Sequence, residues 1–292
     1  MMPRSLTVFL IRRPMPARGF TLIEAIVSIA ILGVLGGIVA MFIGKPIQGY
    51  FDASRRAALT DQADAALRRI TRDLHLALPN SLRLANAGGI NYIEFIMTTS
   101  GGRYRVDADG STGGNVLSFT NPAALNFDVL GAMPTNPPIV PGDFIVVYNL
   151  GPGNAPADAY GGGNRAQVGG IAGNTLTLVA NPFALQAPPL PSPVARFQVV
   201  PAATQAVTYA CADVLTPAAN LTRRWNYGFT VAQGTPPAGG ATAILAGGAN
   251  CAVEYAPNAS GRNGLLLINL TLSDASGERV SLAQQIRIDN TP

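Results

Sequence analysis

The residues best placed to do chemistry lie near the start of the chain, in the stretch RGFTLIEAIVSIAILG at residues 18–33. Glu24 is the only charged residue in the run from Phe20 to Ile43. A carboxylate in lipid is costly unless it has a partner. We therefore expect this glutamate either to find a partner or to sit where water reaches it.

The run around Glu24 predicts a membrane-spanning helix. Its 24 residues are enough to cross a bilayer, and they form a longer apolar stretch than an ordinary signal peptide has. Residues 1–19 are basic and broken by prolines, and they predict a leader peptide rather than a folded element. Basic residues before an apolar run stay on the cytoplasmic side, so we expect residues 20–45 to span the membrane once. The leader arginines are Arg4, Arg12, Arg13 and Arg18.

Two small residues on this helix, Gly33 and Gly37, have the G-x-x-x-G spacing. Small residues four apart allow two helices to approach closely in lipid. The same residues are equally consistent with local flexibility and no fixed partner. The sequence leaves both interpretations open.

Residues 46–79 predict an amphipathic continuation of the helix, which Pro79 ends. Asp64 with Arg68, and Arg69 with Asp73, are spaced four apart, which predicts ion pairs on its outer faces. The apolar residues recur every three or four positions and form one stripe: Leu59, Ala63, Ala66, Leu67, Ile70, Leu74 and Leu78.

Residues 80–292 predict a β-rich globular domain with long loops. Charged residues make up only 12% of the chain, and 32 glycines and 23 prolines punctuate short apolar runs. Together with the helix, this predicts an α+β fold in which a long N-terminal helix packs on an antiparallel β-rich domain. Residues 151–164 and 186–193 predict loops, and residues 264–289 predict a hairpin with its turn at 274–278. The other expected strands are 92–97, 116–120, 144–148, 175–179, 196–200 and 206–210.

The two cysteines, Cys211 and Cys251, are 40 residues apart. One histidine cannot complete a zinc site with them, so we expect no metal there. Outside the cytoplasm a disulfide is the natural pairing, and two buried thiols are the alternative. The leader arginines account for the excess of 20 basic over 16 acidic residues, so no basic patch for nucleic acid is expected.

Catalytic chemistry is not expected. The single histidine, His75, follows Leu74 without a partner of catalytic type, and only four glutamates are available. Asp107 and Asp109 have the alternating acids of a calcium loop, but position twelve is Ser118 instead of an acid, which favours a polar turn. We expect no cofactor.

The order of these features resembles the type IV pilin and pseudopilin family: a basic leader, then GFTLIEAIVSIAILG at residues 19–33, then an amphipathic helix and a sheet. The resemblance implies cleavage after Gly19 by a prepilin peptidase, followed by N-methylation of Phe20. A Cβ at Gly19 would obstruct the close approach of the peptidase to the backbone. It also implies that Glu24 pairs with the Phe20 amine of a neighbouring subunit. The alternative is a carboxylate that reaches the headgroup water without a partner.

The length of the chain and the stretches 47–56, 67–84 and 272–288 resemble a minor pilin of an MSHA-like pilus. A J-type pseudopilin of a type II secretion system and an adhesin displayed on the filament are the alternatives. The implied partners are the prepilin peptidase, other major and minor pilins, and the assembly platform of the inner membrane. The implied location is the inner membrane with a periplasmic domain, and then the filament.

Overall fold

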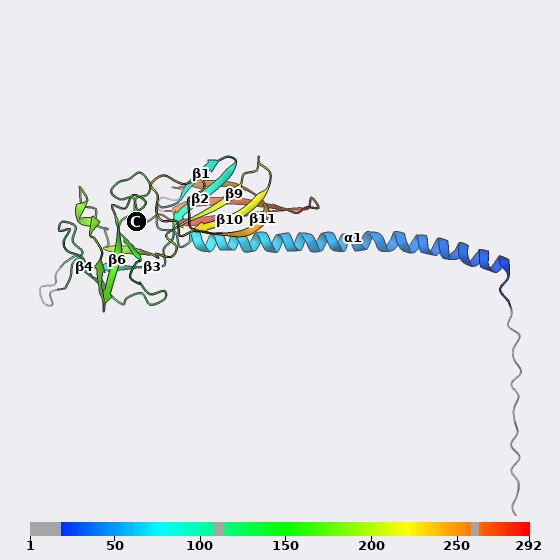
Figure 1. The fold of residues 1–292 in the computed structure, drawn as a ribbon, viewed down its shortest axis with the longest axis horizontal. Coiled ribbons are helices and arrows are strands. Elements are labelled where there is room, and N and C mark those ends of the chain that lie inside the picture. The colour runs from blue at the N-terminus through cyan, green and yellow to red at the C-terminus, as the bar shows by residue number, and fades with distance from the viewer. Residues whose placement is uncertain (1–18, 108–113, 258–262) are drawn as a thin grey trace, which may run out of the picture. The chain divides into compact units, whose positions relative to one another are not determined.

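The computed structural model describes residues 19–107, 114–257 and 263–292, and it leaves the side chains of residues 43–46 undescribed. The chain divides into two compact units, residues 1–54 and 55–292. A single helix, α1 (Leu22–Leu74), begins in the first unit, continues through Pro46 and ends in the second. The expected α+β class is confirmed by this helix and by the antiparallel strands of residues 83–289 (Figure 1).

The second unit contains a seven-stranded sheet whose order is β1-β2-β9-β10-β11-β12-β13. All neighbouring strands in this order are antiparallel. The predicted C-terminal hairpin is confirmed as β12 and β13, paired over 11 residues. The strands are β1 (Arg83–Ala87), β2 (Ile90–Ile96), β9 (Ala206–Ala212), β10 (Ala219–Trp225), β11 (Ala241–Ala256), β12 (Asn263–Ser273) and β13 (Arg279–Asp289).

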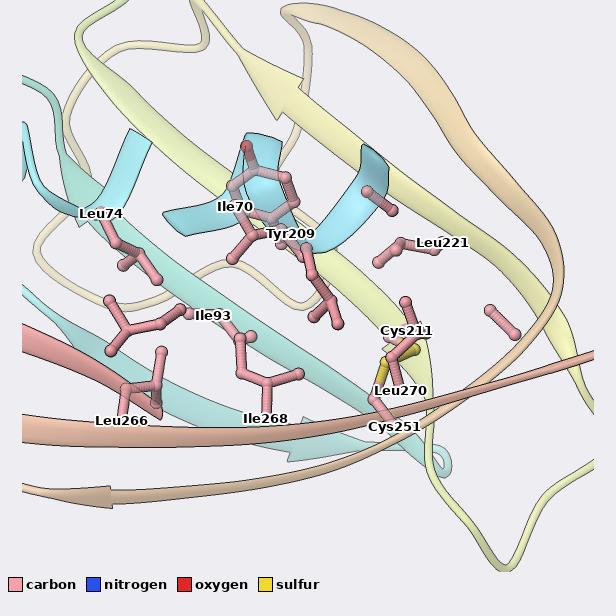
Figure 2. Packing of buried hydrophobic residues seen from close by; sticks show 14 of the residues in the cluster. Ile70, Leu74, Ile93, Tyr209, Cys211, Leu221, Cys251, Leu266, Ile268 and Leu270 are labelled. Carbon is pink, nitrogen blue, oxygen red and sulfur yellow. A yellow bond between two sulfur atoms is a disulfide. The ribbon is translucent and has the colours of Figure 1, made fainter. Parts of the chain in front are cut away.

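The predicted apolar stripe of α1 covers one face of this sheet. Ile70 and Leu74 are buried in one cluster with residues from β2, β9, β11, β12 and β13 (Figure 2). Ala63 and Leu67 belong to the same cluster. Because successive strand residues point to opposite faces, each strand contributes every second side chain. The helix ends at Leu74 and does not continue to Pro79 as expected, because the N–H of Leu78 bonds to the carbonyl of Ile96 at 2.8 Å.

A closed six-stranded barrel lies between β2 and β9 in the sequence, with the order β3-β4-β7-β6-β5-β8. It has its own core, which includes the fully buried rings of Tyr104, Phe127, Phe183 and Phe197. No barrel was expected from the sequence. Its elements are β3 (Ser100–Tyr104), β4 (Asn126–Leu130), β5 (Phe144–Val146), β6 (Arg165–Ala172), β7 (Thr175–Leu178), the 3-10 helix η1 (Pro182–Leu185) and β8 (Arg196–Val200).

The strand expected at 116–120 is wrong. This segment is irregular: the N–H of Leu117 bonds to the carbonyl of Arg105 at 3.1 Å, and its side chain fills the barrel core. The other expected strands are present with small shifts at their ends. The 16-residue strand β11 was missed because its sequence is rich in alanine and contains Gly247 and Gly248.

Asp128 on β4 ties three segments of the barrel together. Its carboxylate accepts hydrogen bonds from the Thr175 hydroxyl at 2.8 Å and from the backbone N–H of Asn115 at 2.9 Å. Arg105 lies 3.5 Å away. The Thr175 bond, followed by those from Asn115 and the Arg105 charge, lowers the pKa of Asp128.

A lowered carboxyl pKa gives a specific pH dependence. The stability that ionised Asp128 contributes is present above the ordinary value near 3.8, and it is lost as pH falls through the folded-state pKa. We expect Asp128→Asn to flatten the loss of melting temperature between about pH 5 and pH 3, relative to the parent chain. Equal losses in both proteins would contradict this assignment. Thermal melts of the two detergent-solubilised proteins at each pH measure the melting temperatures to be compared.

Candidate functional site

The described part of the first unit begins at Gly19, and α1 starts three residues later. Thr21 caps the helix: its hydroxyl accepts the N–H of Glu24 at 3.3 Å, and its carbonyl accepts the N–H of Ala25 at 3.1 Å. T-x-x-E at a helix start is the residue pattern of a capping box. Glu24 therefore lies in the first turn of α1, where the helix dipole favours a negative charge.

Glu24 is exposed, and the Ser28 hydroxyl donates to its backbone carbonyl at 2.7 Å. Its carboxylate has no ion-pair partner among the described residues. Cleavage after Gly19 would leave the new amine on Phe20, one residue before the helix cap. The expected pairing of these two groups between subunits stays a prediction.

The apolar part of α1 exposes large hydrophobic side chains around its whole circumference. An 18-residue window has a mean hydropathy of 2.7, and none of it is buried within the chain. A helix that is apolar on all sides is typical of a membrane span. At Gly33 and Gly37 an added Cβ would meet nothing within 4 Å. Any close packing at these glycines would therefore be with another molecule, and both interpretations of the G-x-x-x-G spacing stay open.

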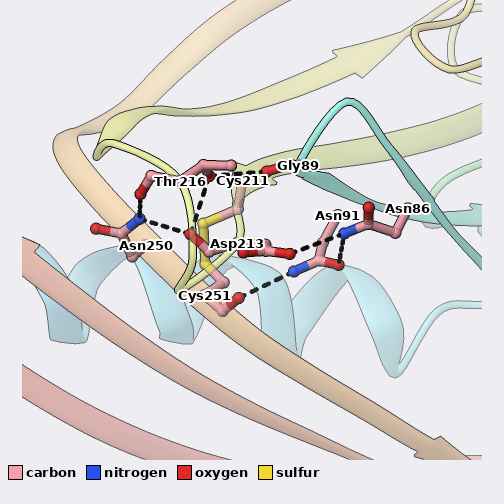
Figure 3. Close-up of a disulfide and its surroundings, with 8 residues drawn as sticks. All are labelled: Asn86, Gly89, Asn91, Cys211, Asp213, Thr216, Asn250 and Cys251. Carbon is pink, nitrogen blue, oxygen red and sulfur yellow. Dashed lines mark hydrogen bonds between the residues drawn. A yellow bond between two sulfur atoms is a disulfide. The ribbon is translucent and has the colours of Figure 1, made fainter.

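The second unit contains the expected disulfide, between Cys211 on β9 and Cys251 on β11, so the alternative of two thiols is wrong (Figure 3). Hydrogen bonds surround it. The Asn250 amide donates to the carbonyls of Asp213 at 2.7 Å and Thr216 at 2.9 Å, and the Thr216 hydroxyl donates to the Gly89 carbonyl at 2.9 Å. The disulfide and these bonds together hold the 213–216 loop on the sheet.

We expect the double substitution Cys211→Ser with Cys251→Ser to lower the free energy of unfolding by about 2–4 kcal/mol, since a cross-link of this loop length restricts the unfolded chain by roughly that amount. Urea unfolding of the full chain in detergent measures the loss. A reductant should lower the free energy of unfolding of the parent protein to that of the variant. A parent that is as stable as the variant before reduction would contradict the prediction.

Asp73 was expected on an outer face of the helix, and this is wrong. It is 1% exposed, and its carboxylate accepts bonds from Arg223 Nε at 2.7 Å and from the Tyr209 hydroxyl at 2.8 Å. The predicted pair with Arg69 also forms, at 3.2 Å. Burial, together with the Asp73 charge, raises the pKa of Tyr209. The sequence indicated only Arg69 as a partner, because Arg223 is 150 residues away.

A second buried ion pair lies within the sheet, between the cross-strand partners Arg83 on β1 and Glu94 on β2. Both Arg83 Nη2 and Nε donate to the carboxylate of Glu94, at 3.0 and 3.2 Å, and the guanidinium lies 3.7 Å from the centre of the Tyr160 ring. The Tyr160 hydroxyl donates to the Ser81 carbonyl at 3.0 Å. Burial raises the pKa of Glu94, and the adjacent Arg83 opposes this shift. The pair was not predicted because no strand was expected at residues 83–87, and the contact with Tyr160 has no local signal in the sequence.

The remaining candidate residues from the sequence are the two aspartates of the calcium-like loop and the single histidine. Asp109 lies outside the described residues, and Asp107 is exposed. In the described ranges no group of three or more histidine, cysteine or acidic residues could hold a metal. His75 is exposed on the turn after α1.

Comparison with known families gives one finding, which concerns the N-terminal segment of the chain. Residues 14–40 match the family model described as the prokaryotic N-terminal methylation motif. Searches of curated proteins and of solved structures found no match. The motif supports a type IV pilin-like or pseudopilin protein, and with it processing by a prepilin peptidase and assembly with other pilins. The motif and the apolar helix fit a protein that crosses the inner membrane once and then enters a filament.

Proposed function

We propose that the chain is a minor pilin of an MSHA-like type IV pilus, similar to the MSHA pilus biogenesis protein MshO, and that it acts in initiation or at the filament tip without catalysis. The observation that carries the proposal is the methylation motif at the start of an apolar helix whose continuation anchors a folded domain. In this proposal the domain of residues 80–292 is periplasmic before assembly.

The N-terminal residues have separate roles in this proposal. Gly19 allows the peptidase to reach the backbone, Phe20 becomes the methylated N-terminus, and Glu24 pairs with the amine of a neighbouring subunit. Pairing in lipid sets the register of docking, because an unpaired buried charge is strongly unfavourable.

A role as a filament-displayed adhesin is a second candidate, and the barrel supports it. This module has its own hydrophobic core, and none of its described residues belongs to the cluster beneath α1. A J-type pseudopilin of a type II secretion system would share the same motif and helix. Incorporation into pili, as opposed to a secretion phenotype, distinguishes it from the minor pilin.

The first test is intact-mass measurement of the membrane-extracted chain from cells with and without a prepilin peptidase. We expect a mature N-terminus at methylated Phe20 only when the peptidase is present. Gly19→Val should abolish this cleavage completely, and Ser5→Ala in the leader serves as a control that is still cleaved. A chain that keeps residues 1–19 in both strains would overturn the proposal.

A further inference from the structure

The seven-stranded sheet ends in an unpaired edge at β13. This strand pairs with β12 along its whole length without a bulge, and it contains no proline. Within the described residues, no backbone hydrogen bond joins its other side to a further segment. An edge of this kind presents free N–H and C=O groups to any extended chain. β13 can therefore accept an eighth strand.

A groove of about 440 Å³ lies beside this edge, between α1 and β13. Gln284 lines it from the strand, and Leu67, Thr71 and Leu76 contribute from the helix and the turn that follows. The remaining lining side chains are charged or polar: Asp64, Arg68, Arg72 and His75. An added strand would point every second side chain toward α1. Addition to a sheet edge uses backbone bonds for affinity and such pockets for specificity. Leu67 and Leu76 offer apolar contacts to alternate side chains of the added chain.

The charges around this edge define the rest of the partner. Arg279 and Arg287 are exposed on the face of β13 that points away from α1, and neither has an ion-pair partner among the described residues. The acid on that face, Asp289, accepts the N–H of Thr291 at 2.9 Å. Opposite charges on neighbouring strands stabilise a pair, so the face favours acidic residues on the added strand.

We propose that the β13 edge binds an extended segment of a partner protein in which acidic and apolar residues alternate. The apolar side chains enter the groove beside Thr71, and the acids face Arg279 and Arg287. Three independent observations support this proposal: the free backbone edge of β13, the groove beside it and the two unpaired arginines. It goes beyond the proposed pilin role and does not depend on it.

The test uses the full chain in detergent and a fluorescent peptide of alternating glutamate and valine, nine residues long, so that one glutamate can lie opposite each of Arg279 and Arg287. We expect saturable binding by fluorescence anisotropy, with slowed amide hydrogen exchange in residues 281–287. Thr71→Arg and Leu76→Arg each fill the groove, and both should weaken binding by at least about tenfold. Leu185→Arg, at a 74% exposed position on the barrel, is the matched control that should bind normally.

The controls decide the outcome. A melting temperature equal to that of the parent shows that a groove variant is folded. If Thr71→Arg is unfolded, the effect of the groove on binding is judged from Leu76→Arg, which lies after the helix. A lysine–valine peptide with the same alternation should bind at least about tenfold more weakly. The proposal is overturned by absent binding, by equal binding of the two peptides, or by unchanged exchange in β13 at saturation.

Discussion

Replacing Asp73 by asparagine is expected to lower the free energy of unfolding by about 3–5 kcal/mol, because breaking a buried ion pair leaves the other charge uncompensated. The remaining buried charge is the Arg223 guanidinium, which lies 3.7 Å from Met97 Sδ and 4.8 Å from the centre of the Trp225 ring. For a domain of this size the loss corresponds to roughly 10 °C in melting temperature. Trp225 is the only tryptophan, so its fluorescence reports unfolding at this place.

Asp64→Asn is the matched control for Asp73. Asp64 pairs with Arg68 at 2.8 Å on the same helix, but both side chains are largely exposed, and we expect a change of about 0.5 kcal/mol or less. Replacing the pair together, as Asp73→Leu with Arg223→Met, should recover part of the lost stability, since no buried charge is then left unpaired and Arg69 is 41% exposed. Equal effects of Asp73→Asn and Asp64→Asn would contradict a buried network.

Replacing Glu24 by alanine is expected to reduce the amount of the chain in sheared filaments by more than about tenfold, since an unpaired amine in the apolar bundle costs more than 1.4 kcal/mol. Processing should continue, because Gly19 and Phe20 are intact. Quantitative blotting of filament and membrane fractions measures the ratio, and Glu24→Gln should match the alanine variant.

Thr21→Ala separates the charge of Glu24 from its place in the helix cap. It removes the hydroxyl that accepts the Glu24 N–H but keeps the carboxylate. Loss of a cap costs only about 1 kcal/mol, so we expect near-normal incorporation. If Thr21→Ala fails as badly as Glu24→Ala, the cap is responsible and not the pairing. Ser28→Ala, which keeps both groups, is the neutral control.

Local patterns predicted the parts of this molecule that depend on nearby residues. The stripe that includes Ala63 and Ile70 repeats every three or four residues, which only a helix with one buried face satisfies. The methylation motif is contiguous, and residues 264–289 alternate across a recognisable turn. Each of these signals is complete within about thirty residues.

The features that could not be predicted from the sequence depend on contacts between residues far apart in the chain. Closure of the barrel joins β3 to β8 across 91 residues, and β3 has the sequence SGGRY, which carries little strand propensity. Asp73 had a plausible neighbour in Arg69, so its buried partner on β10 could not be inferred from spacing. The contact of Arg83 with the Tyr160 ring likewise forms only once the barrel is folded against the sheet.

The position of the barrel in the chain has a consequence for how such a protein can change. The polypeptide leaves the sheet after Ile96 and re-enters it at Ala206, and these two residues are direct cross-strand partners. The end of β2 and the start of β9 thus lie side by side in the sheet, and the barrel is inserted between them. An inserted domain of another length or fold could connect the same two strand ends. The inserted domain can therefore change without a change in the pairing of the sheet.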